Sequence, residues 1–310
     1  MFFLLFAWSG VGFPQVPSLK EGVADKKRGF SMPGYYIWCP SVIKADGLYH
    51  LFASRWPAAY GMNGWLEHSE IIRATSRSLE GPYSFAEVVL VKRPSYWDDK
   101  RVHNPKIMRV GNKYVLFYIS SANQTGYAVA DQISGPWKRS DKPVIPFSNP
   151  APLLLGRDSV YVFGRKEVAG KRFSQAYVSA SFNGPYHQLD SSRTNLLPGQ
   201  NELEDPCIWR KNGKFVVICS DFKGSATGIV KAGVQYVSND GIDYRLVSEG
   251  PVYTKSLHYS DLTAEVFKRR ERPFVYTSDQ GDPIALFTAC LPKDGPALIL
   301  VTPLHIFQTF

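Results

Sequence analysis

The sequence predicts an all-β fold, a five-bladed β-propeller, and three observations lead to this prediction. Five segments share one layout, in which a proline near the start of one strand is followed by a turn and a second strand. A turn that contains glycine and precedes an aromatic residue recurs between these segments. The resulting four-strand unit repeats about every fifty residues, which is typical of blades arranged around one axis.

The clearest copy of the first layout is the stretch 203–219, which contains Asn212-Gly213 between two apolar runs. Asn-Gly is a strong hairpin signal, because both central turn positions require positive φ. In three copies an aromatic residue follows the proline at the same spacing (40 to 49, 105 to 114, 206 to 215). The other two copies, which begin at Pro150 and Pro273, require a slightly longer hairpin.

The second motif lies between the copies of the first layout. It consists of a strand end, a glycine turn and an aromatic residue that begins the next strand. Its four copies are Gly81-Pro82-Tyr83, Gly135-Pro136-Trp137, Gly184-Pro185-Tyr186 and Gly241-Ile242-Asp243-Tyr244.

The repeats favour one large domain over two smaller ones, because a blade cannot bury its faces without neighbours. We predict a single propeller over residues 31–310 of the 310 and an N-terminal extension over residues 1–30. The strand 297–301, or one near 35–38, is expected to close the ring. Met1–Trp8 is apolar but lacks a basic flank, so it is either a signal-peptide remnant or a buried strand.

Composition limits the partners and the location. The formal net charge is +9, but the basic residues are scattered and form no nucleic-acid motif, so we expect neither nucleic acid nor a membrane as a partner. No segment is long enough to span a membrane. The four cysteines form no CxxC pair, which argues against zinc, and buried free thiols are expected, with disulfides left open. A periplasmic or extracellular location is expected, and a cytoplasmic one stays open.

The candidate site follows from the topology. Inner strands of a propeller converge on the axis, so residues just before each proline should meet in one funnel. This set mixes acids, amides, an imidazole and a guanidinium, and burying such groups unpaired would be costly. It comprises Cys39, His103-Asn104, Ser148-Asn149, Glu204-Asp205 and Glu271-Arg272.

Two carboxylates that face one pocket can act as general acid and general base when their environments separate their pKa values. Glu204 and Asp205 are adjacent, so on a strand only one of them should face the funnel. We therefore predict that Glu271 supplies the second catalytic carboxylate. His103 is a further catalytic candidate, as a proton donor or as a ligand of an axial ion. Structural ion pairs and hydrogen bonds are the alternative for each of these residues.

Other polar and aromatic residues are candidates for binding substrate. The long connection between two strands of blade one carries tryptophans that could stack on a sugar or simply pack over the domain. Arginines after second strands could clamp a carboxylate or phosphate. The predicted substrate-binding residues are Asn104, Asn149, Arg272, Arg55, Trp56, Trp65, His68, Arg165 and His258.

The hairpins that open with proline, together with His103-Asn104-Pro105, Glu204-Asp205-Pro206 and Glu271-Arg272-Pro273, resemble five-bladed β-propeller glycoside hydrolases of family 43 and family 117. The resemblance implies an exo-acting glycosidase for a plant or algal glycan. Family 43 implies an Asp in blade one, an Asp in blade three and a Glu in blade four. This chain has Cys39 and Asn149 in the first two places. Family 117 implies a histidine acid, which makes His103 and His258 candidates.

Two further functions are compatible with the same fold. A glycoside phosphorylase would require a pocket of cationic side chains for phosphate, and the basic charge permits one. A glycan-binding propeller without catalysis would fit the missing aspartate of blade one. In each case the partner is a carbohydrate. No cofactor is expected to be required, an axial metal ion such as calcium stays open, and the sequence does not set the oligomeric state.

Overall fold

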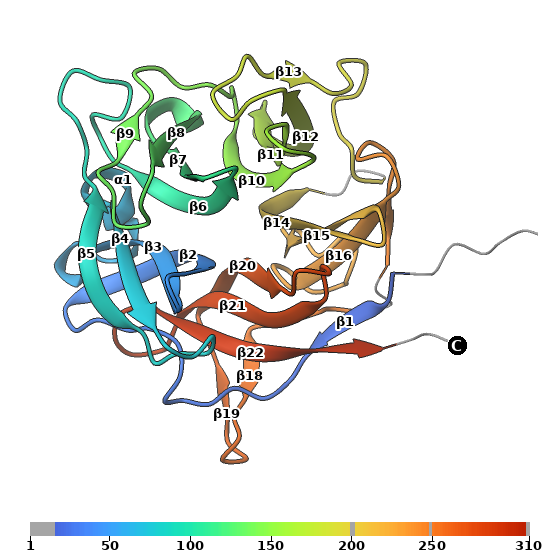
Figure 1. Ribbon diagram of the computed structural model, residues 1–310. Helices are drawn as coiled ribbons and strands as arrows, with labels where there is room; N and C mark the ends of the chain where they lie inside the picture. The colour runs from blue at the N-terminus through green and yellow to red at the C-terminus, as the bar shows by residue number, and fades with distance from the viewer. Residues whose placement is uncertain (1–15, 199–201, 248–249, 308–310) are drawn as a thin grey trace, which may run out of the picture.

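A computed structural model describes residues 16–198, 202–247 and 250–307, and within them five four-stranded antiparallel sheets surround one axis. Figure 1 shows the inner strands β2, β6, β10, β14 and β20 around the centre of the ring. The predicted five-bladed β-propeller is therefore confirmed. Met1–Trp8 lies outside the described residues.

The first three blades follow the chain in order, with the innermost strand first. Blade one consists of β2 (Tyr35–Ala45), β3 (Leu48–Pro57), β4 (Glu70–Ser76) and β5 (Ser84–Leu90). Blade two consists of β6 (His103–Val110), β7 (Lys113–Ile119), β8 (Thr125–Ala130) and β9 (Lys138–Arg139). Blade three consists of β10 (Ser148–Leu154), β11 (Val160–Val168), β12 (Lys171–Ser179) and β13 (His187–Gln188).

Blade four has the same order, and blade five combines both ends of the described chain. Blade four consists of β14 (Leu203–Lys211), β15 (Lys214–Asp221), β16 (Gly233–Ser238) and β17 (Tyr244–Leu246). Blade five consists of β20 (Arg269–Thr277), β21 (Pro283–Leu291), β22 (Leu298–Phe307) and β1 (Ser18–Glu21).

The strand β1 closes the ring, and this corrects the sequence prediction. It pairs antiparallel with β22, so residues 18–21 form the outer strand of blade five although the predicted propeller began at residue 31. The two segments predicted to close the ring have other places: residues 35–38 begin the inner strand β2, and 298–301 belong to the third strand β22. Leu19 is buried between blades four and five and anchors β1 there.

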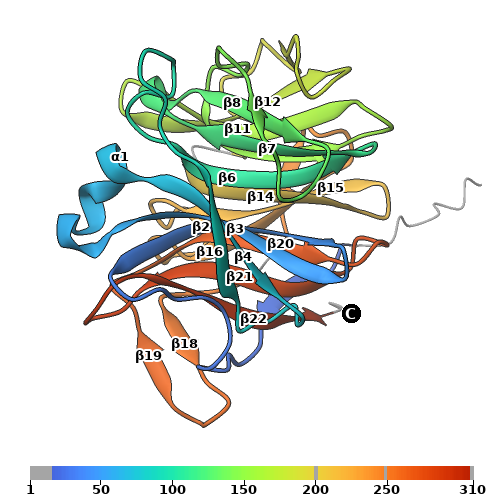
Figure 2. The same ribbon diagram turned by 60° about the vertical axis from the view of Figure 1, so that its left-hand side comes forward.

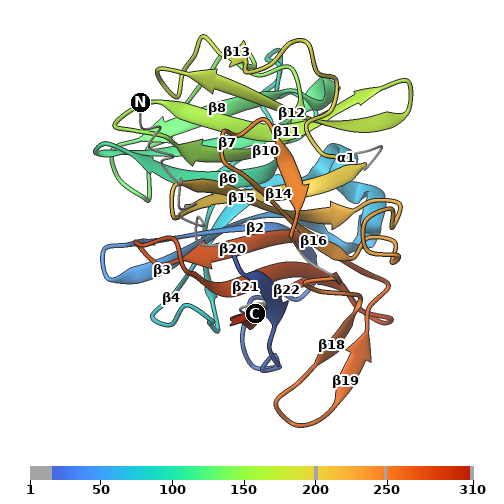
Figure 3. The same ribbon diagram turned by 90° about the vertical axis from the view of Figure 1, so that its right-hand side faces the viewer.

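Short elements decorate the ring. The β3–β4 connection holds the 3₁₀ turns η1 (Ala58–Tyr60) and η2 (Met62–Gly64) and the helix α1 (Trp65–His68), and η3 (Ser121–Asn123) lies between β7 and β8. The strands β18 (Ser256–His258) and β19 (Ala264–Val266) form a separate hairpin that projects from blade five (Figures 2 and 3). No helix among the described residues is long and apolar enough to cross a bilayer.

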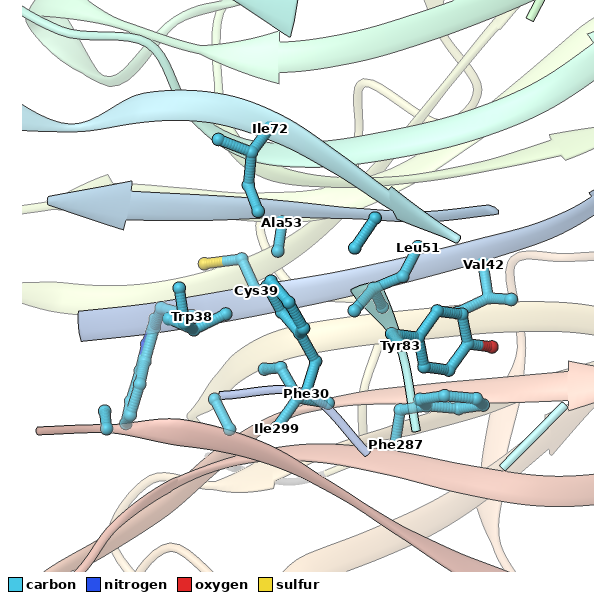
Figure 4. Close-up of a cluster of buried hydrophobic side chains, with 14 of the residues drawn as sticks. Phe30, Trp38, Cys39, Val42, Leu51, Ala53, Ile72, Tyr83, Phe287 and Ile299 are labelled. Atoms are coloured by element: carbon cyan, nitrogen blue, oxygen red, sulfur yellow. The ribbon is translucent and has the colours of Figure 1, made fainter. Parts of the chain in front are cut away.

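Five apolar clusters hold the blades together, one between each pair of neighbours. Strands of adjacent blades contribute alternate side chains to them, as expected for face-to-face sheets. Figure 4 shows the cluster between blades five and one, where Trp38, Leu51 and Val42 lie near Phe287 and Ile299. All four cysteines are buried and free, which confirms the prediction of buried thiols.

Each inner strand carries a β-bulge at its X-Pro dipeptide, and this repeated feature positions the site. The strand register shifts at the same place in all five blades. The residue before the proline has a positive φ of 53–59° in each case, a conformation that non-glycine residues rarely adopt. A bulge redirects side chains and is often found beside active sites. The five residues are Cys39, Asn104, Asn149, Asp205 and Arg272.

The closing strand gives a stability prediction. Substitution of Leu19 by Ala should lower the free energy of unfolding by about 2–5 kcal/mol, because a fully buried leucine leaves a cavity at the junction of blades four and five. Urea denaturation followed by tryptophan fluorescence measures the change. The exposed Lys27→Ala is the control and should lie within about 0.5 kcal/mol of wild type. Equal stability of Leu19→Ala and wild type would contradict a structural role for β1.

Candidate active site

The five bulged residues meet at the axis, and four of them form a buried polar chain. Asn104 donates a hydrogen bond from Nδ2 to Oδ1 of Asn149 (3.0 Å), and Asn149 donates from Nδ2 to Oδ1 of Asp205 (3.1 Å). Arg272 forms an ion pair with Asp205 at 2.7 Å and also donates to Asn149. The residues predicted from the X-Pro pattern are thus brought together from blades two to five.

Three carboxylates, Asp205 among them, lie close together where the inner strands begin. Oxygen atoms of Glu204, Asp205 and Glu271 lie within 4.8 Å of one another. Lys231 bridges two of them, with Nζ 3.2 Å from Glu204 and 3.0 Å from Glu271. Glu204 also accepts from Arg165 (3.1 Å) and Arg172 (3.0 Å). The predicted pairing of a blade-four acid with Glu271 in one funnel therefore matches the geometry.

The environments of the two adjacent acids push their pKa values apart. Burial raises the pKa of Asp205 to about 6: Arg272 opposes the shift, and the charges of Glu204 and Glu271 add to it. Burial also favours the neutral form of Glu204, but Lys231, Arg272, Arg165 and Arg172 outweigh it and lower the pKa of that carboxyl. Oδ2 of Asp205 is buried without a hydrogen-bond partner, so its ionised form lacks a donor on that oxygen, in line with the raised pKa.

His103 lies on the opposite side of the axis, next to blade one. Its Nδ1 is 2.8 Å from Oγ of Ser69, and its Nε2 is 3.4 Å from Sγ of Cys39. Burial holds the pKa of His103 well below its ordinary value, and the cations Arg272 and Arg101 lower it further. The ring is therefore neutral near pH 7. Both ring nitrogens face protein atoms, so this orientation offers no lone pair to an axial ion.

The acidic cluster also has the donor atoms of a possible metal site. Three carboxylate oxygens within 4.8 Å are close enough to share one divalent ion. However, the ammonium group of Lys231 already lies between Glu204 and Glu271, and Arg272 pairs with Asp205. A metal ion would have to displace Lys231 from both glutamates. The protein thus supplies a cation to this cluster, and a metal ion would compete with Lys231 for the two glutamates.

The predicted substrate-binding residues of blade one have mixed outcomes. Trp56 is fully buried, stacks on Tyr36 and donates to Gly61, so it is a core residue and not a sugar platform. Arg55 is buried and paired with Glu70 at 2.7 Å. Trp65 is half-buried and packs against His103, whereas exposed His68 stacks on Tyr60.

The other two predicted binding residues, His258 and Arg165, have different outcomes. His258 is exposed on the hairpin β18–β19, on the outside of blade five, and this corrects its prediction as a funnel residue (Figure 3). Arg165 does reach the site, but its guanidinium is paired with Glu204 and Glu167.

Sequence reasoning missed Lys231, Arg172 and Ser69, which lie in or directly after the connections between second and third strands. The inner strand leaves the funnel face and the second strand returns to it, so each connection from second to third strand must lie on that face. Lys231 precedes β16, Arg172 lies at the start of β12, and Ser69 precedes β4. This rule of alternation could have found all three before the structure was known.

A hollow lies at the end of the axis opposite the acidic cluster. It encloses about 560 Å³ and is lined by the far ends of the inner strands and by the hairpin turns, including Asn212-Gly213 and Gln280-Gly281. Its polar lining residues include Arg109, Arg210 and Asp279, but no pair of carboxylates. Acid–base chemistry is therefore better served at the funnel that holds Glu204, Asp205 and Glu271.

Comparisons with known proteins bear on the fold. No protein-family model matches the sequence, and no curated protein matches it. Many solved structures do match. One is a complex of BT0996 with RGII, with a TM-score of 0.69 and 12% identity, covering 94% of this protein and 93% of the matched one.

Two other matches carry family names. Zg3597, a family 117 glycoside hydrolase of the marine bacterium Zobellia galactanivorans, has a TM-score of 0.65 and 14% identity, with 93% of this protein and 90% of that one covered. CoXyl43, a GH43 β-xylosidase/α-arabinofuranosidase from a compost metagenome, has a TM-score of 0.61 and 14% identity, with 94% and 96% covered. The resemblance to five-bladed propellers of families 43 and 117 is thus confirmed for the fold.

The raised pKa of Asp205 predicts a specific dependence of stability on pH. A carboxyl with a higher pKa in the folded than in the unfolded state stabilises fully below about pH 4, and this stabilisation is lost as pH rises through about 6. The loss is on the order of 3 kcal/mol. Asp205→Asn does not titrate, so its stability relative to wild type should rise by up to that amount between pH 4 and 7.

Urea denaturation at several pH values measures this difference. Exposed Asp158→Asn is the matched control and should parallel wild type throughout. A constant difference between wild type and Asp205→Asn from pH 4 to 7 would show that Asp205 titrates normally.

The ammonium group within the acidic cluster predicts that chelators have little effect. Prolonged dialysis against EDTA should change the melting temperature by less than about 1 °C, because Lys231 already neutralises the cluster. Differential scanning calorimetry with and without added Ca²⁺ measures it. A drop of several degrees that Ca²⁺ restores would contradict our assignment of the site's charge.

Proposed function

We propose that the protein is a glycoside hydrolase whose acid and base come from the acidic cluster in the propeller funnel. The observation that carries the proposal is the meeting of Glu204, Asp205 and Glu271 at one point, with the pKa values of two of them shifted in opposite directions. The lowered pKa of Glu204 suits a base, and the meeting of three carboxyl groups places a second one within reach as the acid. Glycosidase names among the fold's solved relatives support the same chemistry.

Glu204 and Glu271 are the carboxylates that reach the funnel surface. The side chain of Glu204 is 14% exposed and that of Glu271 7%, whereas that of Asp205 is 1% exposed. Glu204 has three cationic partners and stays ionised, so we assign it the role of base. Glu271 has one cationic partner, Lys231, and we assign it the role of acid.

Asp205 then acts as a positioning residue beneath the reacting groups. Its charge state changes the repulsion that Glu204 and Glu271 experience, because the three groups are within 4.8 Å. Arg272, Asn149 and Asn104 hold Asp205 in place through the axial chain. His103 is neutral and buried, so in this proposal it supports the funnel wall through Ser69 and does not donate the catalytic proton.

One observation favours a second function, a glycan-binding propeller without catalysis. Every carboxylate of the cluster has at least one cationic partner, and Cys39 occupies the blade-one position where the family 43 resemblance implies an aspartate. The same cations, Arg165, Arg172 and Lys231, would also suit phosphate in a phosphorylase. The experiment below separates the three.

The proposal predicts that Glu204→Gln and Glu271→Gln each lower kcat/KM by roughly 10²–10⁴-fold on aryl glycosides and oligosaccharides of arabinose, xylose and 3,6-anhydrogalactose. The two should differ in leaving-group dependence. A dinitrophenyl glycoside leaves without a proton, so it should largely rescue Glu271→Gln but not Glu204→Gln. Steady-state kinetics over the panel, with and without phosphate, measures both effects.

The control is Glu265→Gln, a charge-matched change on the hairpin β18–β19, which should retain wild-type rates. Full activity of both funnel variants would overturn the assignment. Sugar binding by wild type without turnover over the whole panel would establish the binding module, and phosphate-dependent product release would establish the phosphorylase.

A further inference from the structure

Arg101 differs from the other buried arginines in the part of the chain that the structure describes. Arg55, Arg101 and Arg270 are all more than nine-tenths buried. Arg55 pairs with Glu70 and Arg270 pairs with Glu21. Arg101 has no carboxylate partner within 4 Å among the described residues. A guanidinium stays ionised even when buried, so the charge of Arg101 is uncompensated.

The contacts of Arg101 leave part of its hydrogen-bonding capacity unused. Nη1 donates to the carbonyl oxygen of Leu66 at 3.2 Å, and the guanidinium lies 4.8 Å from the centre of the Trp65 ring. Nε is buried and has no partner. A buried donor without an acceptor destabilises the fold, so this arrangement is hard to explain by structure alone.

Arg101 lies on the funnel side of blade two. It precedes His103, the first residue of the inner strand β6, by two positions. Arg101 and Arg272 both lower the pKa of His103, so both guanidinium groups act on the same imidazole. His103 also packs against Trp65. Arg101 therefore belongs to the wall that faces the axial chain from blades one and two.

The rest of the funnel does not supply a counter-charge. Four cations pair with the three carboxylates of the cluster, and two of these cations, Arg165 and Arg172, also pair with Glu167 and Glu202. The cations are Arg165, Arg172, Lys231 and Arg272, and each of them is paired with Glu204, Asp205 or Glu271. None of the described carboxylates is paired with Arg101, so its charge is left to be matched by another anion.

We propose that Arg101 binds an anionic group of the glycan, a uronic acid carboxylate or a sulfate ester, and so selects acidic over neutral sugars. The inference deepens the proposed function and rests on it for the nature of the ligand as a glycan. The fork of N–H donors on a guanidinium matches the paired oxygens of either group. Arg55 and Arg165, the arginines that the sequence suggested for this role, are already paired with glutamates.

Binding to the full-length protein tests this selection with matched sugars: glucuronate against glucose, galacturonate against galactose, and glucose 6-sulfate against glucose. Wild type should bind at least one acidic member roughly tenfold to hundredfold more tightly than its neutral partner. Arg101→Gln should lose that preference and keep the affinity for the neutral sugar. Isothermal titration calorimetry or ligand-observed NMR measures both.

Two further variants keep the test decisive. Arg157→Gln, on an exposed turn at the other end of the axis, removes the same charge and should retain the preference. Arg101→Lys keeps the charge but not the fork, so it should bind the acidic sugar with intermediate affinity, and it replaces Arg101→Gln if circular dichroism shows that the latter is unfolded.

The comparison of wild type with Arg101→Gln decides between the outcomes. Loss of the preference for the uronate or for the sulfated sugar in Arg101→Gln supports the proposal and identifies the anion. A preference that survives in Arg101→Gln, or its absence from wild type, overturns it. The experiment measures binding and not hydrolysis. A protein without hydrolase activity can therefore still show the preference for acidic sugars, whereas a hydrolase without that preference contradicts only the role of Arg101.

Discussion

The buried ion pair between Arg272 and Asp205 is the interaction on which the candidate site depends. It joins blades four and five at the axis, and Asn149 and Asn104 extend it to blades three and two. All four residues reach the axis only because a bulge turns the backbone before each proline. A buried pair of this kind loses much more when one partner is removed than it gains by being present. The site geometry is therefore tied to the strained backbone of every inner strand.

Every carboxylate of the acidic cluster is paired with a cationic side chain. Each carboxylate that could move a proton is held by a cation from a different blade or connection, most directly by Lys231. This matching lowers the pKa of Glu204 in a buried setting, whereas burial raises the pKa of Asp205 although Arg272 pairs with it. Arg101, which pairs with none of the described carboxylates, adds a positive charge beside these matched groups. The charge balance thus bears on both the chemistry and the choice of ligand.

Much of this arrangement could be predicted from sequence, because local signals coincide with the repeat. The X-Pro dipeptides and the Asn212-Gly213 turn identify inner hairpins, and the same dipeptides lead to Asp205 and Glu271. Strand β1 could not be found in this way: it has four residues, no turn motif and a partner that lies far along the sequence. Trp56 was misassigned because a tryptophan beside a long loop has the same sequence signature whether it is buried or exposed.

The closure of the ring by β1 has a consequence for how the protein matures. Ser18 pairs with Phe307. Strand β1 is therefore synthesised long before its partner β22, and blade five is complete only after β22 has been made. Until then the apolar flanks of blades four and five stay open to solvent and to other nascent proteins. Synthesis should therefore expose an aggregation-prone interval that ends only when β22 emerges.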